Sequence, residues 1–237
     1  MRSSDAENLE DLTLTDKRRV RKPRAAAKVK NKSKRRRWHR SSGRETEAKL
    51  IAVATPLFAK LGFDAVSTRM IAKRAAVTIP VIYLYFSNKR DLYLRCCVEV
   101  FGGGAKAMLT ALQDSGSPEE RVFQTLHALA KALMADANLG HLFQRELLAA
   151  DKEGLDLLER ATMRESFDLL HRTIEEAMGS PVPELTVVSI YALTFGLFQY
   201  MHVGNIIEAS PKPEDAAEWL ARQVARVTLP DIYQRLF

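Results

Sequence analysis

The sequence predicts an all-α protein in which a three-helix N-terminal domain precedes a larger helical domain. Apolar residues recur at three- and four-residue intervals in long blocks, which is the spacing of one face of an α-helix. Breakers such as Gly179-Ser180-Pro181 separate these blocks. No run alternates β-branched and polar residues between turn signals, as a strand would. The 237 residues, 46% apolar and 27% charged, have a globular composition that excludes a collagen-like or wholly disordered chain.

Positive charge is concentrated at the N-terminus. Residues 1–44 hold 16 Lys and Arg against 5 Asp and Glu, which leaves 20 basic and 24 acidic residues in the rest of the chain. Because residues 1–43 contain few large apolar side chains, we expect them to form a disordered basic arm. Such an arm either neutralises nucleic-acid phosphates without selecting sequence or only solubilises the chain.

Three helices are predicted after the arm. The first begins at Arg44 and ends before Gly62, with a kink expected at Pro56 because proline supplies no N–H to the preceding turn. The second runs from an N-cap at Ser67 or Thr68 through Ala75. A three-residue connection leads to the third helix, which we expect to run from an N-cap at Thr78 to about Tyr85. Two short helices joined in this way are typical of a helix-turn-helix, whose second helix enters a DNA major groove.

This region resembles the N-terminal domain of TetR-type transcriptional regulators. Four segments carry the resemblance by their order and spacing: LFAKLGF at 57–63, STRMIA at 67–72, AAVT at 75–78 and IYLYFSNKRDL at 82–92. The resemblance implies an all-helical homodimer, with a DNA-binding domain at residues 44–92 and a ligand-binding and dimerisation domain at residues 93–237. The implied partners are double-stranded DNA, a second copy of the chain and a small-molecule effector of unknown identity. No cofactor and no membrane partner are implied.

The resemblance also assigns DNA contacts by position. At the start of the second helix, Thr68 and Arg69 would contact phosphates. The residues of the third helix that would meet base edges and sugars are Thr78, Ile79, Pro80, Val81, Tyr83 and Leu84. The DNA backbone would be held by Tyr83, Tyr85 and Lys89. Ile82 and Phe86 are instead expected to be core.

The turn and the third helix depart from the family pattern. Ala76 stands where the family commonly has glycine, so the backbone must either avoid a left-handed conformation or accept strain. Ile79, Val81 and Leu84 occupy positions where polar base readers are frequent. Apolar groups can contact thymine methyls but cannot form the bidentate hydrogen bonds that select G or A. Recognition of the DNA sequence would therefore depend on DNA shape and on the basic arm.

The larger domain is predicted to consist of further helices. The fourth helix continues to Phe101, and Gly102-Gly103-Gly104 is expected to kink or unwind it. Ser117-Pro118-Glu119-Glu120 is a strong start signal, and Gly179-Ser180-Pro181 is an equally clear stop. The expected helices are 105–113, 118–137, 139–150, 153–178, 183–206 and 214–235.

The last two helices match the family's dimer interface, while a central core helix in a monomer is the alternative for the apolar segment 185–207. The candidate anchors are Tyr191, Phe195, Phe198, Trp219 and Val224. Polar residues among apolar ones are candidates for an effector pocket, although each alone is more often a satisfied core or surface group. They are His127, His141, Gln144, Arg145, His171, Tyr191, Gln199 and His202.

Enzymatic and metal sites are not predicted. The chain has no G-x-S-x-G, H-E-x-x-H, C-x-x-C, P-loop or dinucleotide motif, and its five histidines lack metal-ligand pairings. Its two cysteines, Cys96 and Cys97, are adjacent, which argues against a disulfide framework and suits a reducing compartment. Neither a membrane-spanning run nor a secretory signal is recognisable, so we expect a cytoplasmic location.

These features together predict a sequence-specific DNA-binding transcriptional regulator, a repressor released from a palindromic operator by a small molecule. Two alternatives remain open. One is a packaging protein whose basic arm binds DNA without sequence preference. The other is a helical small-molecule binding protein that has lost DNA binding.

Overall fold

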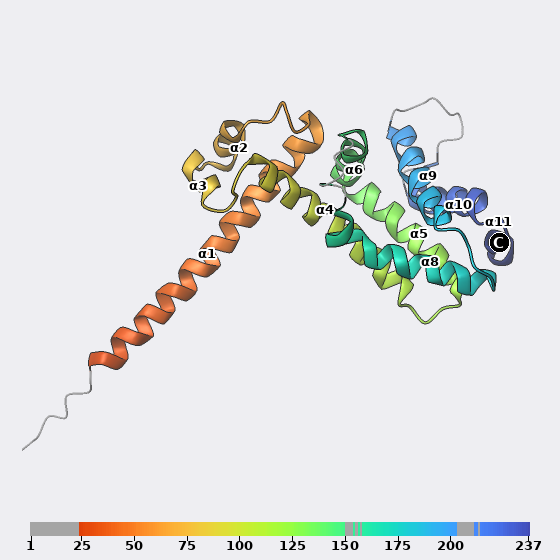
Figure 1. The fold of residues 1–237 in the computed structure, drawn as a ribbon, viewed down its shortest axis with the longest axis horizontal. Coiled ribbons are helices and arrows are strands. Elements are labelled where there is room, and N and C mark those ends of the chain that lie inside the picture. The colour runs from red at the N-terminus through yellow and green to blue at the C-terminus, as the bar shows by residue number, and fades with distance from the viewer. Residues whose placement is uncertain (1–23, 150–153, 155, 157, 203–210, 213) are drawn as a thin grey trace, which may run out of the picture. The chain divides into compact units, whose positions relative to one another are not determined.

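The all-α prediction is confirmed. The computed structural model describes residues 24–149, 154, 156, 158–202, 211–212 and 214–237, and this part of the chain holds helices and no strand (Figure 1).

The chain divides into two units, Met1–Arg44 and Glu45–Phe237. The predicted boundary between residues 92 and 93 falls inside a single helix, and the division of the larger unit into two domains stays a prediction. The helices are α1 Arg24–Leu61, α2 Thr68–Ala75, α3 Ile79–Tyr83, α4 Lys89–Leu112, α5 Pro118–Ala135, α6 Ala137–Ala149, η1 Glu159–Met163, α8 Arg164–Met178, α9 Leu185–His202, α10 Ala216–Thr228 and α11 Pro230–Leu236.

Helix α1 is longer than predicted. It begins at Arg24 rather than at the predicted Arg44, and the disorder of the arm stays a prediction. The segment after Pro23 is rich in Ala, Lys and Arg, which are strong helix formers, and this local preference outweighs the lack of apolar side chains. Residues 1–23 of the predicted arm lie outside the described residues.

Helices α2 and α3 form the predicted helix-turn-helix. The Ser67 hydroxyl accepts a hydrogen bond from the Met70 N–H at 3.2 Å, which confirms the N-cap of α2. Thr78 occupies the N-cap position of α3 without a side-chain bond, and α3 ends at Tyr83 rather than Tyr85. The core beneath these helices contains fully buried side chains from α1, α2, α3 and the segment that follows: Leu50, Phe58, Ile71, Ile82 and Phe86.

The turn between α2 and α3 places a non-glycine residue in the left-handed region. Ala76 has φ 53° and ψ 45°, and it is the only non-glycine residue with positive φ in the described part of the chain. Its N–H caps α2 by donating to the carbonyls of Ala72 and Lys73. Of the two outcomes that the sequence allowed, the backbone takes the strained one.

Replacing Ala76 with glycine should stabilise the protein. The left-handed conformation costs a residue with a Cβ about 1–2 kcal/mol, and part of this is offset by the freedom that glycine loses on folding, so we expect a net gain of about 0.5–1 kcal/mol. Urea unfolding measures this change. Ala52→Gly, at an exposed position inside α1, is the matched control and should lose about 1 kcal/mol. Equal destabilisation by both substitutions would contradict the strain at Ala76.

Helix α4 runs without interruption through its three glycines. The expected unwinding at Gly102-Gly103-Gly104 and the separate helix 105–113 are therefore wrong, and the kink stays a prediction. Buried side chains on both sides of the triplet, including Phe101 and Met108, pack against the core and outweigh the weak helix propensity of glycine. A Cβ added at Gly102 or Gly103 would meet no atom within 4 Å.

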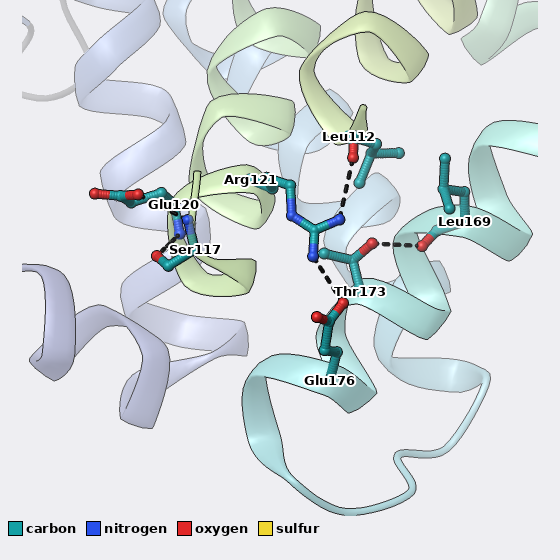
Figure 2. Close-up of polar contacts among 7 residues, drawn as sticks. All are labelled: Leu112, Ser117, Glu120, Arg121, Leu169, Thr173 and Glu176. Carbon is teal, nitrogen blue, oxygen red and sulfur yellow. Dashed lines mark hydrogen bonds and ion pairs between the residues drawn. The ribbon is translucent and has the colours of Figure 1, made fainter. Parts of the chain in front are cut away.

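Helices α4, α5 and α8 pack together in the larger part of the chain. The predicted capping box of α5 is confirmed: the Ser117 hydroxyl accepts from the Glu120 N–H at 3.3 Å, and the Glu120 carboxylate accepts from the Ser117 N–H at 2.9 Å. Figure 2 shows Arg121 of α5 joining its two neighbours, because its guanidinium donates to the Leu112 carbonyl at the end of α4 and to Glu176 of α8. Arg121 therefore links α5 to both α4 and α8.

Two predicted helices are divided. The segment expected as one helix at 153–178 contains a π-helical turn, η1, before α8, and α8 ends at the predicted stop with Gly179 in the left-handed region. The segment expected at 214–235 is divided by Pro230, whose missing N–H ends α10 and which then occupies the first turn of α11. In the described ranges, no helix is both long and apolar enough to cross a bilayer.

Candidate nucleic-acid interface

Helix α3 presents an exposed apolar surface. Leu84 is 79% exposed and Tyr83 49% exposed, while Thr78 and Pro80 are also exposed and Val81 is half-buried. Ile79 and Tyr85 pack partly against the core, so they contribute less to this surface than the sequence suggested. Five of the predicted base-reading residues are thus exposed or half-buried: Thr78, Pro80, Val81, Tyr83 and Leu84.

Helix α2 supplies positive charge beside α3. Arg69, Lys73 and Arg74 are exposed, and Thr68 is half-buried at the start of the helix. Helices α2 and α3 contact each other across the turn. A basic helix next to an exposed second helix suits contact with phosphates on either side of a groove.

Lys89 has a role inside the fold that the sequence did not indicate. Its ammonium donates to the carbonyls of Phe63 and Val66 at 2.9 and 3.1 Å and lies 4.1 Å from the centre of the Phe63 ring. An ammonium has three donors, so one remains for a phosphate. Lys89 therefore ties the start of α4 to the loop before α2, and its contact with DNA stays a prediction.

Arg145 of α6 binds the end of α1. Its guanidinium donates to the carbonyls of Ala59 and Lys60, each at 3.0 Å, and so satisfies two acceptors that the last turn of a helix leaves free. Gly62 follows with φ 86°, and a Cβ there would lie 2.8 Å from the Arg145 Nη1. The sequence suggested Arg145 as a ligand contact, but it instead connects α6 to the first helix of the helix-turn-helix region.

The neighbouring residue, Glu146, makes a second connection. Glu146 and Tyr93 of α4 are both buried, and the Tyr93 hydroxyl donates to the Glu146 carboxylate. Burial, followed by the nearby Cys97 and Glu146, raises the pKa of Tyr93 well above its usual value. The Tyr93 ring packs edge-on against Phe58 and Phe63. Two adjacent residues of α6 thus hold both α1 and α4, an arrangement that the sequence did not predict.

The buried thiols of α4 should make the protein less stable in alkali. Burial raises the pKa of Cys96 to about 12 and raises that of Cys97 further, from an ordinary value of 9.0. Their stabilising effect is complete below pH 9 and is lost as the pH rises, because the unfolded thiols ionise while the folded ones remain neutral. We expect the free energy of unfolding to fall by about 1.4 kcal/mol per pH unit for each thiol above that point.

Urea unfolding at pH 8, 9 and 10 measures this dependence. A Cys96→Ala, Cys97→Ala double variant removes both thiols and should flatten the decline between pH 9 and 10. The same steep decline in that variant would show that other groups cause it.

The predicted pocket residues do not line one cavity. His171 contacts the Val182 carbonyl through Nε2 at 2.9 Å, the Tyr191 hydroxyl donates to the Met108 sulfur, and His127 stacks on Phe123. Gln144 and Gln199 line a different groove, and Arg145 is bound to α1. His141 is half-buried and lines neither of the two cavities described next. The side chain of His202 lies outside the described residues. These residues are therefore spread over several places in the described ranges, and their shared role in an effector pocket stays a prediction.

Two cavities lie near α9. A groove of about 560 Å³ runs between α6 and α9, and the buried Nε2 of Gln199 at its edge has no hydrogen-bond partner among the described residues. A second, nearly filled cavity of about 10 Å³ has an apolar lining from α4, α5, α6, η1 and α9, with Ser166 of α8 as a polar member. No group of potential metal ligands is found in the described ranges.

The predicted dimer anchors are mostly internal. Phe198 and Val224 are fully buried in the protomer, and Phe195 and Tyr191 are 6% and 9% exposed, so they cannot supply contact area to a second chain. Trp219 is only half-buried. Because α9 is apolar around its circumference, the sequence does not show which of its faces points outward, and the dimer anchors stay a prediction. That face instead carries Leu185, Val188, Ala192, Gly196 and Tyr200, all exposed.

Comparison with known proteins identifies the helix-turn-helix segment. Residues 50–96 match the family described as bacterial regulatory proteins, tetR family. The chain is 28% identical over 104 residues to the "Fatty acid metabolism regulator protein" of Bacillus subtilis (strain 168), a match that covers 44% of this chain and 54% of that protein. It is 24% identical over 174 residues to the "Probable HTH-type transcriptional regulator YttP" of the same strain, covering 70% and 84% of the two chains.

Solved structures share the fold. One is the fatty acid degradation regulator FadR from Bacillus halodurans, with a TM-score of 0.60, 19% identity, and coverage of 75% of this chain and 93% of that one. The proteins found by sequence similarity are named as regulators rather than enzymes.

Proposed function

We propose, for a chain that belongs to the TetR family of bacterial regulators, that it binds a near-palindromic DNA operator and represses transcription. The observation that carries this proposal is the exposed α3 beside the basic α2, within the segment that matches the family. Two copies would place their α3 helices in successive major grooves, with half-site centres about 34–36 Å apart or somewhat more. We propose a cytoplasmic location, where the operator DNA would be found.

The dimer would form through the outward face of α9. Its exposed residues follow each other at three- or four-residue intervals, from Leu185 through Val188, Ala192 and Gly196 to Tyr200. Small residues in the middle of such a stripe allow two helices to approach closely, and the larger ones at the ends supply apolar area. Val227 of α10, a helix that packs against α9, is 67% exposed and is a further candidate for the dimer contact.

An apolar effector would act through the nearly filled cavity. Its lining includes Phe101, Met108, Leu129 and Phe195, with Ser166 and Tyr191 as the groups that carry hydroxyls. A relative is named for fatty acid metabolism, which supports an acyl-bearing ligand class. Binding there would separate helices that contact α4 and α6. Helix α4 carries Tyr93, and α6 carries Arg145 and Glu146. Through these three residues, α4 and α6 hold the helix-turn-helix region. The effector would thereby lower the affinity for DNA.

Selection of bound fragments from random DNA by the full-length protein tests the proposal. The salt should be near physiological, so that contacts to phosphate alone are suppressed. An enriched palindrome is the expected result. Retention without a motif would favour the packaging alternative, and no retention would favour a small-molecule binding protein.

Tyr83→Ala is the matched variant for this experiment. Because Tyr83 is half exposed, the substitution should leave the fold intact while removing a phosphate contact, and we expect about tenfold weaker binding to all sequences. Lys89→Ala should also weaken binding to all sequences, but it removes two internal hydrogen bonds as well. Its stability therefore has to be measured alongside. Normal binding by both variants would refute the DNA contacts assigned to these positions.

A further inference from the structure

Helix α3 lacks the chemical groups that read purines. From Thr78 to Leu84 the side chains are Thr, Ile, Pro, Val, Ile, Tyr and Leu, and only the Thr78 hydroxyl and the Tyr83 phenol can form hydrogen bonds. Bidentate recognition of guanine uses Arg or Lys, and that of adenine uses Asn or Gln. No residue of this segment can therefore select a purine in the usual way.

What the segment does expose is methyl groups. Leu84, at the end of α3, is 79% exposed, and Val81 one turn earlier is half-buried and is not packed into the core. Ile79 and Ile82 of the same segment do pack against the core, so the fold has apolar positions for side chains that need burial. Leu84 and Val81 thus form an unpartnered apolar edge on the surface.

The charges beside this edge indicate what covers it. Arg69, Lys73 and Arg74 are exposed on α2, which packs directly against α3. An apolar protein partner would have to desolvate these cations, whereas a DNA groove places phosphates opposite them. Of the four bases, only thymine presents a methyl group in the major groove. A DNA duplex that contains thymine is therefore the partner that suits both the exposed cations of α2 and the apolar edge of α3.

We propose that α3 selects DNA sequence by contact with thymine C5 methyl groups, with Leu84 and Val81 as the specificity-determining side chains. This inference rests on the proposed operator binding and adds the base class that the operator must contain. Specificity then comes from burying methyl groups against each other, with phosphate contacts from α2 fixing the position. Cytosine methylated at C5 would present the same group, because the methyl occupies the same place in the groove.

Base-analogue substitution in the selected operator tests this. Replacing thymines by deoxyuridine, one half-site position at a time, removes only the methyl group. We expect affinity of the full-length protein to fall about threefold to fivefold at each contacted thymine, as the loss of one buried methyl predicts. Replacing cytosine by 5-methylcytosine in a T-to-C mutated site should restore part of the lost affinity.

A protein variant closes the test. Leu84→Ala should bind thymine and deoxyuridine operators nearly equally at one position, because the methyl has lost its partner. Leu148→Ala, at a residue of α6 that is 78% exposed, is the matched control and should keep the full thymine preference. An enriched motif whose binding is insensitive to deoxyuridine, or one without thymine, would overturn this inference while leaving operator binding intact. Absence of any enriched motif would instead overturn the proposed function.

Discussion

Deletion of residues 1–43 is expected to weaken DNA binding by about 100- to 1,000-fold at physiological salt, the largest effect on binding that we predict. The segment carries 15 Lys and Arg and 5 Asp and Glu. Each phosphate that it neutralises releases counterions, so the deletion should also flatten the dependence of affinity on salt. The preferred sequence should not change, because phosphate contacts carry no base information.

A shorter deletion is the matched control. Residues 1–16 contain all 5 acidic residues of the segment and a single basic one, Arg2, whereas residues 17–43 contain 14 Lys and Arg and no acidic residue. Removing residues 1–16 should therefore maintain or increase affinity. Titrations at several salt concentrations compare the three proteins. If the longer deletion leaves the salt slope unchanged, the arm does not touch phosphate and serves only solubility.

Glu146→Leu is expected to destabilise the protein by about 1–3 kcal/mol, because it leaves the buried Tyr93 hydroxyl without an acceptor. For a chain of this size, such a loss lowers the melting temperature by several degrees. Glu146→Gln keeps an oxygen that can accept from Tyr93, so it should cost much less. Thermal and urea unfolding of the two variants separate the hydrogen bond from the loss of side-chain volume.

A double variant makes the test specific. Adding Tyr93→Phe to Glu146→Leu removes both partners, and an apolar pair in a buried site can be nearly neutral. The double variant should therefore be more stable than Glu146→Leu alone. Simple addition of the two single effects would show that Tyr93 and Glu146 do not interact in the folded protein.

Local signals in the sequence were sufficient where a capping residue marks the end of a helix. Ser67 and Ser117 cap α2 and α5 as predicted, since a hydroxyl and an N–H three residues apart need no other part of the fold. Gly179 likewise ends α8. The glycine triplet of α4 was misjudged because a propensity of about 1 kcal/mol per residue is smaller than the packing on both sides of it.

The candidate site was predictable only where a motif defined it. The positions of Tyr83 and Leu84 follow from the helix-turn-helix pattern, and both are exposed. Lys89 and Arg145 have partners 23 to 86 residues away, which no periodicity reveals. The face of α9 was also undetermined, because a helix that is apolar all round gives no preferred side.

The two glycines in the middle of α4 have a consequence for motion. Gly102 and Gly103 weaken the helix by about 1 kcal/mol each relative to alanine, and no neighbouring atom within 4 Å requires them to be so small. Opening of the helix should therefore be easiest at this point, between the buried side chains of Phe101 and Met108. Amide hydrogens around Gly103 should exchange with deuterium faster than those around Cys96 or Met108. Helix α4 would then consist of two rigid segments joined at Gly102 and Gly103. The segment that bears Tyr93 could change direction while the other segment keeps its position.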